Sequence, residues 1–267
     1  MIDVLLQPVL AQATDGGASL MMEKLSYLTP EIALFVTTCL AMIMGLSPSR
    51  AVRDALPLVT IVGLVVAGVL AYTGPQMANA PMGDLMRFGK VLIAIVGIPL
   101  ALLMSGTVDR DYEDAVARGL PFDAIRSNRG EFYAFMLFSL MGLMLCTTAD
   151  DLIWLFLALE LTSLPTYVMV SISTGRARSQ EAGIKYFFLG ALGAAVFLFG
   201  FALMYGATGT TLLFGPEGEH TITTAFATQG LGTLGLLGVI LAFIGVCFKI
   251  AAVPMHFYPP DVYEGAS

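Results

Sequence analysis

Long apolar runs alternate with short polar segments from residue 27 onward. Runs of about 17 to 25 apolar residues are long enough to cross a bilayer as helices, and a helix satisfies its own backbone hydrogen bonds where no water can. The pattern predicts an all-α polytopic membrane protein. We expect seven transmembrane helices, at residues 27–46, 55–72, 91–105, 132–148, 151–171, 185–204 and 231–257.

Polar segments divide the chain into five parts. Residues 1–26 are predicted to form an extramembrane tail, residues 27–106 the first three spans, and residues 107–131 a polar loop or short surface helix on the cytoplasmic side. The last four spans fill residues 132–257, and residues 258–267 begin a further connection. The tail contains AQA, which resembles a signal peptidase site. No positively charged region precedes it, so we expect the tail to be retained.

Composition supports a membrane location and argues against several functions. Of the residues, 57% are apolar and only 12% are charged, whereas an average soluble domain is about 25% charged. The net charge of -7 and the absence of a basic stripe argue against nucleic-acid binding. There is no P-loop, no GxGxxG after a predicted strand, no GxSxG and no HExxH, so we expect no nucleotide, flavin or zinc chemistry in this chain.

Three cysteines lie in separate apolar runs, with neither a CxxC partner nor a nearby histidine. Free cysteine is commonly packed away as a small apolar side chain. We therefore expect Cys39, Cys146 and Cys247 to be small buried apolar side chains, with no disulfide and no metal site.

Basic residues gather in alternate loops. The loops after the second, fourth and sixth spans contain a single arginine, Arg87, with Lys90 directly before the third span. The loops after the first, third and fifth spans contain Arg50, Arg53, Arg110, Arg118, Arg126, Arg129, Arg176 and Arg178. Cytoplasmic loops carry the excess of basic residues, so we expect the second set of loops in the cytoplasm and the amino terminus outside.

Two isolated charges lie well inside predicted spans, Glu160 in the fifth and Lys249 in the seventh. An ionised carboxylate at bilayer depth costs about 2.5 to 3.5 kcal/mol on insertion scales, so such residues usually face protein or water and usually act. We expect the two to pair. Burial disfavours a charged ammonium and a nearby carboxylate favours it, so moving the acid would switch the lysine between holding and releasing a proton. The alternative is that both side chains only hold helices together.

Pro254 follows Lys249 within the seventh span. Proline removes a backbone donor and clashes with the preceding turn, so the helix should kink or break there and leave carbonyls free beside Lys249. Broken helices occur at ion sites in transporters. His256, just after the break, either passes protons near neutral pH or is simply packed.

Lys185 opens the predicted sixth span. It either anchors this span at the membrane interface or joins a buried proton relay. Glu181 lies one helical turn earlier and can pair with it along the helix.

Other charged and small residues have simpler expected roles. Glu31 lies in the first turn of the first span, where an acid suits the helix dipole, and Arg87 and Lys90 are expected to extend to the membrane interface. Asp150 or Asp151 can cap the fifth span. In the sixth span, small residues should let neighbouring helices approach closely: Gly190, Gly193, Ala194 and Gly200.

Three stretches resemble a known family. LALELTSLPTYVMVS, EAGIKYFFLGALGAAVFLFGFALMYGATGT and GVCFKIAAVPMHFYPPDVYEGAS, in this order and spacing, are similar to the antiporter-like subunit N (subunit 2) of proton-translocating NADH:quinone oxidoreductase, respiratory complex I. TPEI in the first span and MRFGK before the third fit more weakly. Met255 and Tyr258 stand where the family more often has Phe and Trp, which are conservative replacements.

The resemblance implies a subunit of about fourteen helices in two inverted repeats of five, with a broken helix seven. Glu160 would correspond to the family's glutamate on helix five, Lys185 to its lysine on helix six, and Lys249 to its lysine on helix seven. Beyond Ser267 the family continues into further helices with additional lysines. We therefore expect this chain to be either a fragment of the subunit or a truncated reading of it, and not to complete a proton path alone.

The resemblance also implies partners and location. The chain would be a non-redox subunit of NADH:quinone oxidoreductase, a translocase, in the inner membrane of a bacterial cell. NADH, FMN, iron–sulfur clusters and quinone would belong to partner subunits, so no cofactor and no metal is expected here. Its partners would be other membrane-arm subunits, the lipid bilayer and protons, and not nucleic acid.

Three functions remain to be compared. The first is proton pumping through a relay of Glu160, Lys249, Lys185 and His256, driven by redox chemistry in other subunits. The second is a subunit of a multisubunit Na⁺/proton antiporter, which would share the acid and the lysine. The third is a structural scaffold with no ion path, in which both buried charges would be replaceable.

Overall fold

The computed structural model describes residues 25–75, 83–172, 177–216, 218–253 and 256–266. Within these ranges the chain forms α-helices and no β-strand. The helices are α2 (Thr29–Gly45), α3 (Arg50–Asp54), α4 (Leu56–Thr73), α5 (Gly83–Met104), α6 (Arg110–Ala117), α7 (Arg129–Thr147), α8 (Leu152–Ser171), α9 (Ala177–Thr208), α10 (Ile222–Gln229), α11 (Thr233–Lys249) and α12 (Pro259–Gly265).

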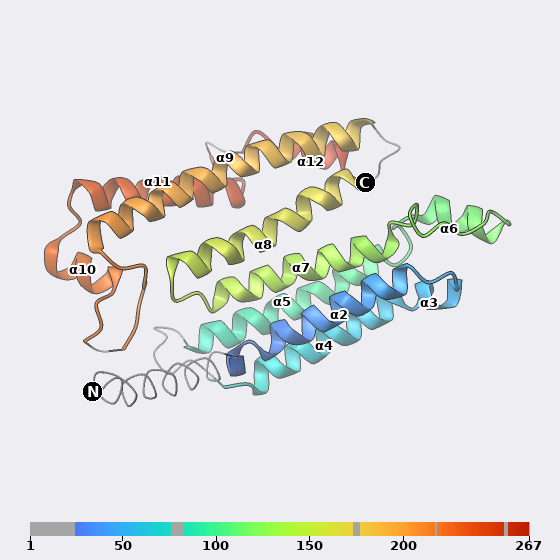
Figure 1. The fold of residues 1–267 in the computed structure, drawn as a ribbon, viewed down its shortest axis with the longest axis horizontal. Helices are drawn as coiled ribbons and strands as arrows, with labels where there is room; N and C mark the ends of the chain where they lie inside the picture. Colours follow the sequence, from blue (N-terminus) through green and yellow to red (C-terminus); the bar gives the residue numbers. More distant parts are fainter. Residues whose placement is uncertain (1–24, 76–82, 173–176, 217, 254–255, 267) are drawn as a thin grey trace, which may run out of the picture.

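The long helices lie side by side in layers (Figure 1). α2, α4, α5 and α7 form one group, α8 packs against α7, and α9 packs against α8 while also contacting α11 and α12. The first group has a core that includes Leu34, Leu64, Tyr133, Leu137 and Met144. A second core, between α8, α9 and α11, includes Ala194, Phe197, Phe201 and Ala242.

Each of the seven predicted spans contains a helix, so the predicted fold class is confirmed. α4 (continued from α3), α5, α7, α8 and α9 are long and apolar enough to cross a membrane, and α2 and α11 are shorter apolar helices of 17 residues each. The predicted cap of the fifth span is also confirmed. Asp151 Oδ1 accepts hydrogen bonds from Ile153 N (2.7 Å) and Trp154 N (3.2 Å) at the start of α8.

Three helix boundaries differ from the prediction by about two turns. α5 begins at Gly83, although the predicted third span began at residue 91. α9 begins at Ala177, well before the predicted start at residue 185, because the polar stretch ARSQEAG continues the helix beyond its apolar part. α11 ends at Lys249, although the predicted span extended to residue 257. Pro254 and Met255 lie outside the described residues, so the predicted effect of this proline is not seen directly.

Small residues bring α9 and α11 into close contact, as predicted for the sixth span. A Cβ atom on Gly200 would lie 2.4 Å from Ala242 N, and a Cβ atom on Gly245 would lie 2.4 Å from Phe197 Cβ. Neither position has room for a methyl group without movement. This close approach positions the end of α11 against the middle of the bundle.

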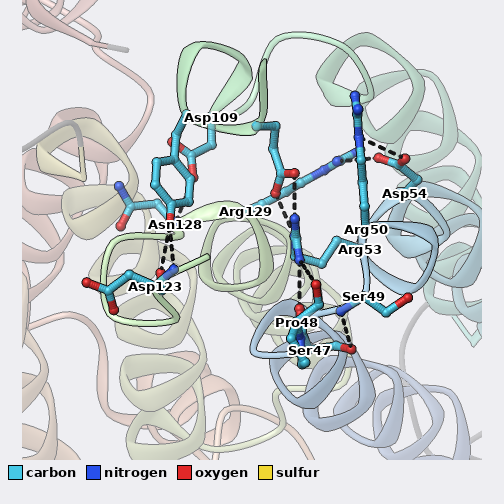
Figure 2. A network of polar contacts seen from close by, with 12 residues as sticks. Ser47, Pro48, Ser49, Arg50, Arg53, Asp54, Asp109, Asp123, Asn128 and Arg129 are labelled. Carbon is cyan, nitrogen blue, oxygen red and sulfur yellow. Dashed lines mark hydrogen bonds and ion pairs between the residues drawn. The ribbon is translucent and has the colours of Figure 1, made fainter. Parts of the chain in front are cut away.

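A network of polar contacts joins α3 to the polar segment that contains α6 (Figure 2). Arg53 is fully buried, and its Nε and second terminal nitrogen donate to the two carboxylate oxygens of Glu113 at 2.7 and 2.8 Å. Its other terminal nitrogen donates to Ser47 O and Pro48 O, and its guanidinium lies 4.1 Å from the centre of the Phe122 ring. The predicted polar segment is therefore fixed to the helical bundle.

Two predictions about single residues are wrong. Lys90 does not extend to the interface, because it is 5% exposed and pairs with the buried Glu31.

Cys39 is exposed on the surface of its helix, whereas Cys146 is half-buried and Cys247 is buried. An apolar surface that faces lipid suits a thiol as well as a core does. Among the described residues, no group of ligating side chains could hold a metal ion.

Candidate functional site

The structure brings together the isolated acid and the isolated base. Lys249 Nζ, at the end of α11, lies 3.0 Å from Glu160 Oε1, in the middle of α8. The two side chains are 12% and 18% exposed. The predicted contact between Glu160 and Lys249 is confirmed.

Ser163 provides a second acceptor for the ammonium. Lys249 Nζ donates to Ser163 Oγ at 2.5 Å, and this hydroxyl donates in turn to Leu159 O at 3.0 Å. Glu160 and Ser163 are three residues apart on α8, which places them on the same helix face. This spacing is visible in the sequence, but a serine in a membrane helix more often bonds only to its own backbone.

The end of α11 has its own stabilising contacts. Its final carbonyls carry the negative end of the helix dipole, which favours a cation at Lys249. Ala251 adopts a left-handed conformation with a φ of 52°, so the chain turns directly after the helix. Tyr258 Oη donates to Phe248 O at 2.9 Å, and its ring stacks on the Phe248 ring with centroids 4.3 Å apart. A tyrosine thus satisfies one of the free carbonyls expected beside Lys249.

α8 contains a proline near the site. Pro165 lies inside this helix and has no N–H to donate to the carbonyl one turn earlier. Lys249 Nζ also lies 5.7 Å from the centre of the Phe197 ring of α9. The pair is largely buried, and two charges interact more strongly in such surroundings than in water.

Lys185 lies elsewhere. Its Nζ is 2.9 Å from Glu181 Oε1, as the sequence predicted, and 2.9 Å from Asp261 Oδ2 of α12. Its side chain is 46% exposed. Lys185 therefore links α9 to α12 through its ion pair with Asp261. Among the described residues, no contact joins Lys185 to the Glu160–Lys249 pair.

His256 is exposed and forms no hydrogen bond or ion pair with the described residues. Its part in a relay stays a prediction, as does that of Lys185. Beyond the predicted set, Ser163 and Tyr258 take part in the site, and Glu31 with Lys90 forms a second buried pair.

Comparison with known proteins finds matches to the part of the chain that contains this site. A family model described as NADH:quinone oxidoreductase/Mrp antiporter, TM matches residues 149–267, which contain both Glu160 and Lys249. NADH-quinone oxidoreductase subunit N of Myxococcus xanthus is 41% identical over 229 residues, covering 84% of this chain and 40% of the relative. Subunit N of Azorhizobium caulinodans is 34% identical over 254 residues, covering 93% of this chain and 49% of the relative. The chain spans less than half the length of these relatives.

Solved structures share the fold. A chain of respiratory complex I from Thermus thermophilus with bound aureothin superposes with a TM-score of 0.64 at 30% identity, over 89% of this chain and 48% of that chain. A chain of the archaeal membrane-bound sulfane sulfur reductase superposes with a TM-score of 0.65 at 20% identity, over 91% of this chain and 47% of that chain. The second likeness concerns the fold alone. From the matched family model, the relatives named subunit N and the shared fold, the chain is similar to NADH:quinone oxidoreductase/Mrp antiporter proteins, and among them it resembles subunit N.

Proposed function

We propose that this chain is part of a proton-translocating membrane-arm subunit of NADH:quinone oxidoreductase, in which Glu160 and Lys249 hold and release a proton. The observation that carries the proposal is the 3.0 Å contact between these two charged side chains, both largely buried, one on α8 and the other on α11. The names of the relatives support the choice of complex. Redox chemistry would occur in other subunits.

The physical basis is the cost of an unpaired buried charge. While the carboxylate lies beside Lys249, the ammonium is stabilised by the opposite charge and by Ser163. If a conformational change draws Glu160 away, the ammonium is left in apolar surroundings and its neutral form becomes favoured. The lysine then gives its proton to another acceptor. Return of the carboxylate prepares the lysine to bind the next proton.

A Na⁺/proton antiporter subunit is the second candidate, because the description of the matched family model also names Mrp antiporters. Both candidates use the same pair of residues. They differ in whether proton movement depends on NADH oxidation or on a sodium gradient.

The test uses the complete subunit in its assembled membrane complex. Lys249→Met and Glu160→Gln are expected to lower NADH-driven proton movement into inverted membrane vesicles by at least about tenfold, the effect of about 1.4 kcal/mol on a rate. Arg178→Met is the matched control, because it also removes one positive charge, from an exposed ion pair with Glu264. Normal NADH-driven proton movement in both site variants would refute the relay. Proton movement that requires Na⁺ and not NADH would favour the antiporter.

A further inference from the structure

A second buried ion pair lies in the first helix group. Glu31 of α2 and Lys90 of α5 have side chains that are 4% and 6% exposed, and Glu31 Oε1 lies 2.7 Å from Lys90 Nζ. Lys90 Nζ also donates to Tyr27 O at 2.9 Å. The proposed Glu160–Lys249 relay does not use this pair.

The Glu31–Lys90 pair has unused capacity for hydrogen bonds. Neither carboxylate oxygen of Glu31 accepts a well-aligned hydrogen bond from the described residues, and the buried Arg87 Nε also lacks an acceptor among them. The Lys90 ammonium has three N–H donors, and its two contacts, with Glu31 Oε1 and Tyr27 O, leave one of them free for a further partner. Buried polar groups in native structures are normally satisfied by protein or by ordered water.

A small cavity lies beside Lys90. Its volume is about 30 Å³, and its polar lining includes Lys90, Arg87, Thr29, Thr148 and Tyr27. A cavity of this size holds a water molecule, and a buried water needs two to four polar partners, which these walls supply. Lys90 and Arg87 therefore border the space for water, and Glu31, which does not line it, contacts the Lys90 ammonium at 2.7 Å.

Few other charges surround the pair. On α5 the charged residues besides Lys90 are Asp84 and Arg87, and α2 and α4 contribute none besides Glu31. The charged residues of α7 are Arg129 and Glu131, in its first turn, whereas Thr148 directly follows the other end of α7. The predicted orientation places this end of the helix group, with the first turn of α2, on the outer side of the membrane.

The buried ion pair between Arg53 and Glu113 is built differently from the Glu31–Lys90 pair. Both carboxylate oxygens of Glu113 accept from Arg53, whose remaining terminal nitrogen donates to two carbonyls. Arg53 and Glu113 have no unsatisfied buried side-chain atom among the described residues. The Arg53–Glu113 pair is thus built as a static structural contact, and the Glu31–Lys90 pair is not.

We propose that Glu31, Lys90 and water in the adjoining cavity form a second protonatable site in this subunit. The proposal rests on the proposed function, since it adds a proton-holding site to a proton-translocating subunit. In one step the Lys90 ammonium gives a proton to the water, which passes a proton on to bulk water. In the other, Glu31 accepts a proton from the Lys90 ammonium, the lysine regains one from the water, and the water is restored from bulk. Each step breaks one bond to hydrogen as another forms, and the charge of the site changes by one unit.

Infrared difference spectroscopy of the assembled complex, between acidic and alkaline solution, tests the site directly. The wild-type spectrum is expected to contain a carboxyl band that Glu31→Gln removes, and a bound-water band that Lys90→Met weakens. Ala71→Leu fills the cavity, which Ala71 lines, without altering either charge, so it should remove the water band alone. The double variant Arg53→Met/Glu113→Gln is the control and should keep both bands.

Identical difference spectra for wild type and Glu31→Gln would overturn the second site. If Glu31→Gln does not assemble, an unchanged water band in Ala71→Leu would overturn it instead. Lys249→Met separates this proposal from the relay, because it should stop coupled proton movement and keep the Glu31 band. Absence of the Glu31 band with pumping that still depends on Lys249 rejects only the second site. A Glu31 band, together with coupled proton movement that Lys249→Met leaves unchanged, rejects only the relay.

Discussion

Lys249 is held by a carboxylate, a hydroxyl and the dipole at the end of its own helix. A hydrogen bond to a charged group contributes about 1.5–3 kcal/mol, about twice the contribution of a neutral one. In apolar surroundings each contact therefore has a large influence on whether the lysine keeps its proton. The hydroxyl is the contact that can be removed without changing any charge.

Ser163→Ala is expected to weaken the hold on the Lys249 ammonium by about 1.5 kcal/mol, which is about tenfold in an equilibrium. NADH-driven proton movement should fall severalfold while the amount of assembled complex stays unchanged. Ser171→Ala is the matched control, since the Ser171 hydroxyl bonds only to carbonyls of its own helix. Equal proton movement in the two variants would show that Ser163 has no part in the relay.

The role of a single charged residue can be predicted from the sequence only where the neighbouring residues allow one interpretation. Glu160 and Lys249 lie far inside apolar runs, so the sequence alone indicates that each needs a partner. Glu31 and Lys90 lie near the ends of their runs, where a helix dipole or the membrane interface explains them equally well. Their pairing depends on how α2 and α5 pack, which no local pattern records.

At the scale of elements, the contact between α9 and α11 positions Lys249. Glycines on both helices allow backbone to approach backbone, as at Gly238, where an added Cβ would lie 2.9 Å from Gly200 O. Membrane helices associate through such small residues because lipid supplies no hydrophobic force between them. The sequence predicted the small residues of α9, but it did not predict which helix they would meet.

Gly200→Ala is expected to destabilise the subunit by about 1–3 kcal/mol, because its Cβ would lie 2.4 Å from the backbone nitrogen of Ala242. Gly206→Ala is the control on the same helix, since a Cβ there would have only Leu234 Cδ2 nearby, at 3.7 Å. Both changes favour the helix itself by about 1 kcal/mol. Thermal unfolding of the complete subunit in detergent should show a lower midpoint for Gly200→Ala alone. Equal midpoints would mean that α11 can move away without cost.

At the scale of the whole molecule, polar contacts occupy the two ends of the helical bundle. One end contains the Arg53–Glu113 network and α12, and the other contains α10 and the Glu31–Lys90 pair (Figure 1). The apolar surfaces of α4, α5 and α9 between these ends expose large side chains such as Leu58, Leu103 and Phe188. Such a surface suits lipid and would be a liability in water.

The distribution of arginines predicts which end faces the cytoplasm, and cysteine labelling can check it. Ile125, 92% exposed beside the Arg53–Glu113 end, and Ala227, exposed on α10 at the other end, are suitable positions. In a background with Cys39, Cys146 and Cys247 replaced by alanine, an impermeant maleimide should label Ile125→Cys in inverted vesicles and Ala227→Cys in right-side-out vesicles. Labelling in detergent provides the control for reactivity. The reverse pattern would place the Glu31–Lys90 pair on the cytoplasmic side and would contradict the predicted orientation.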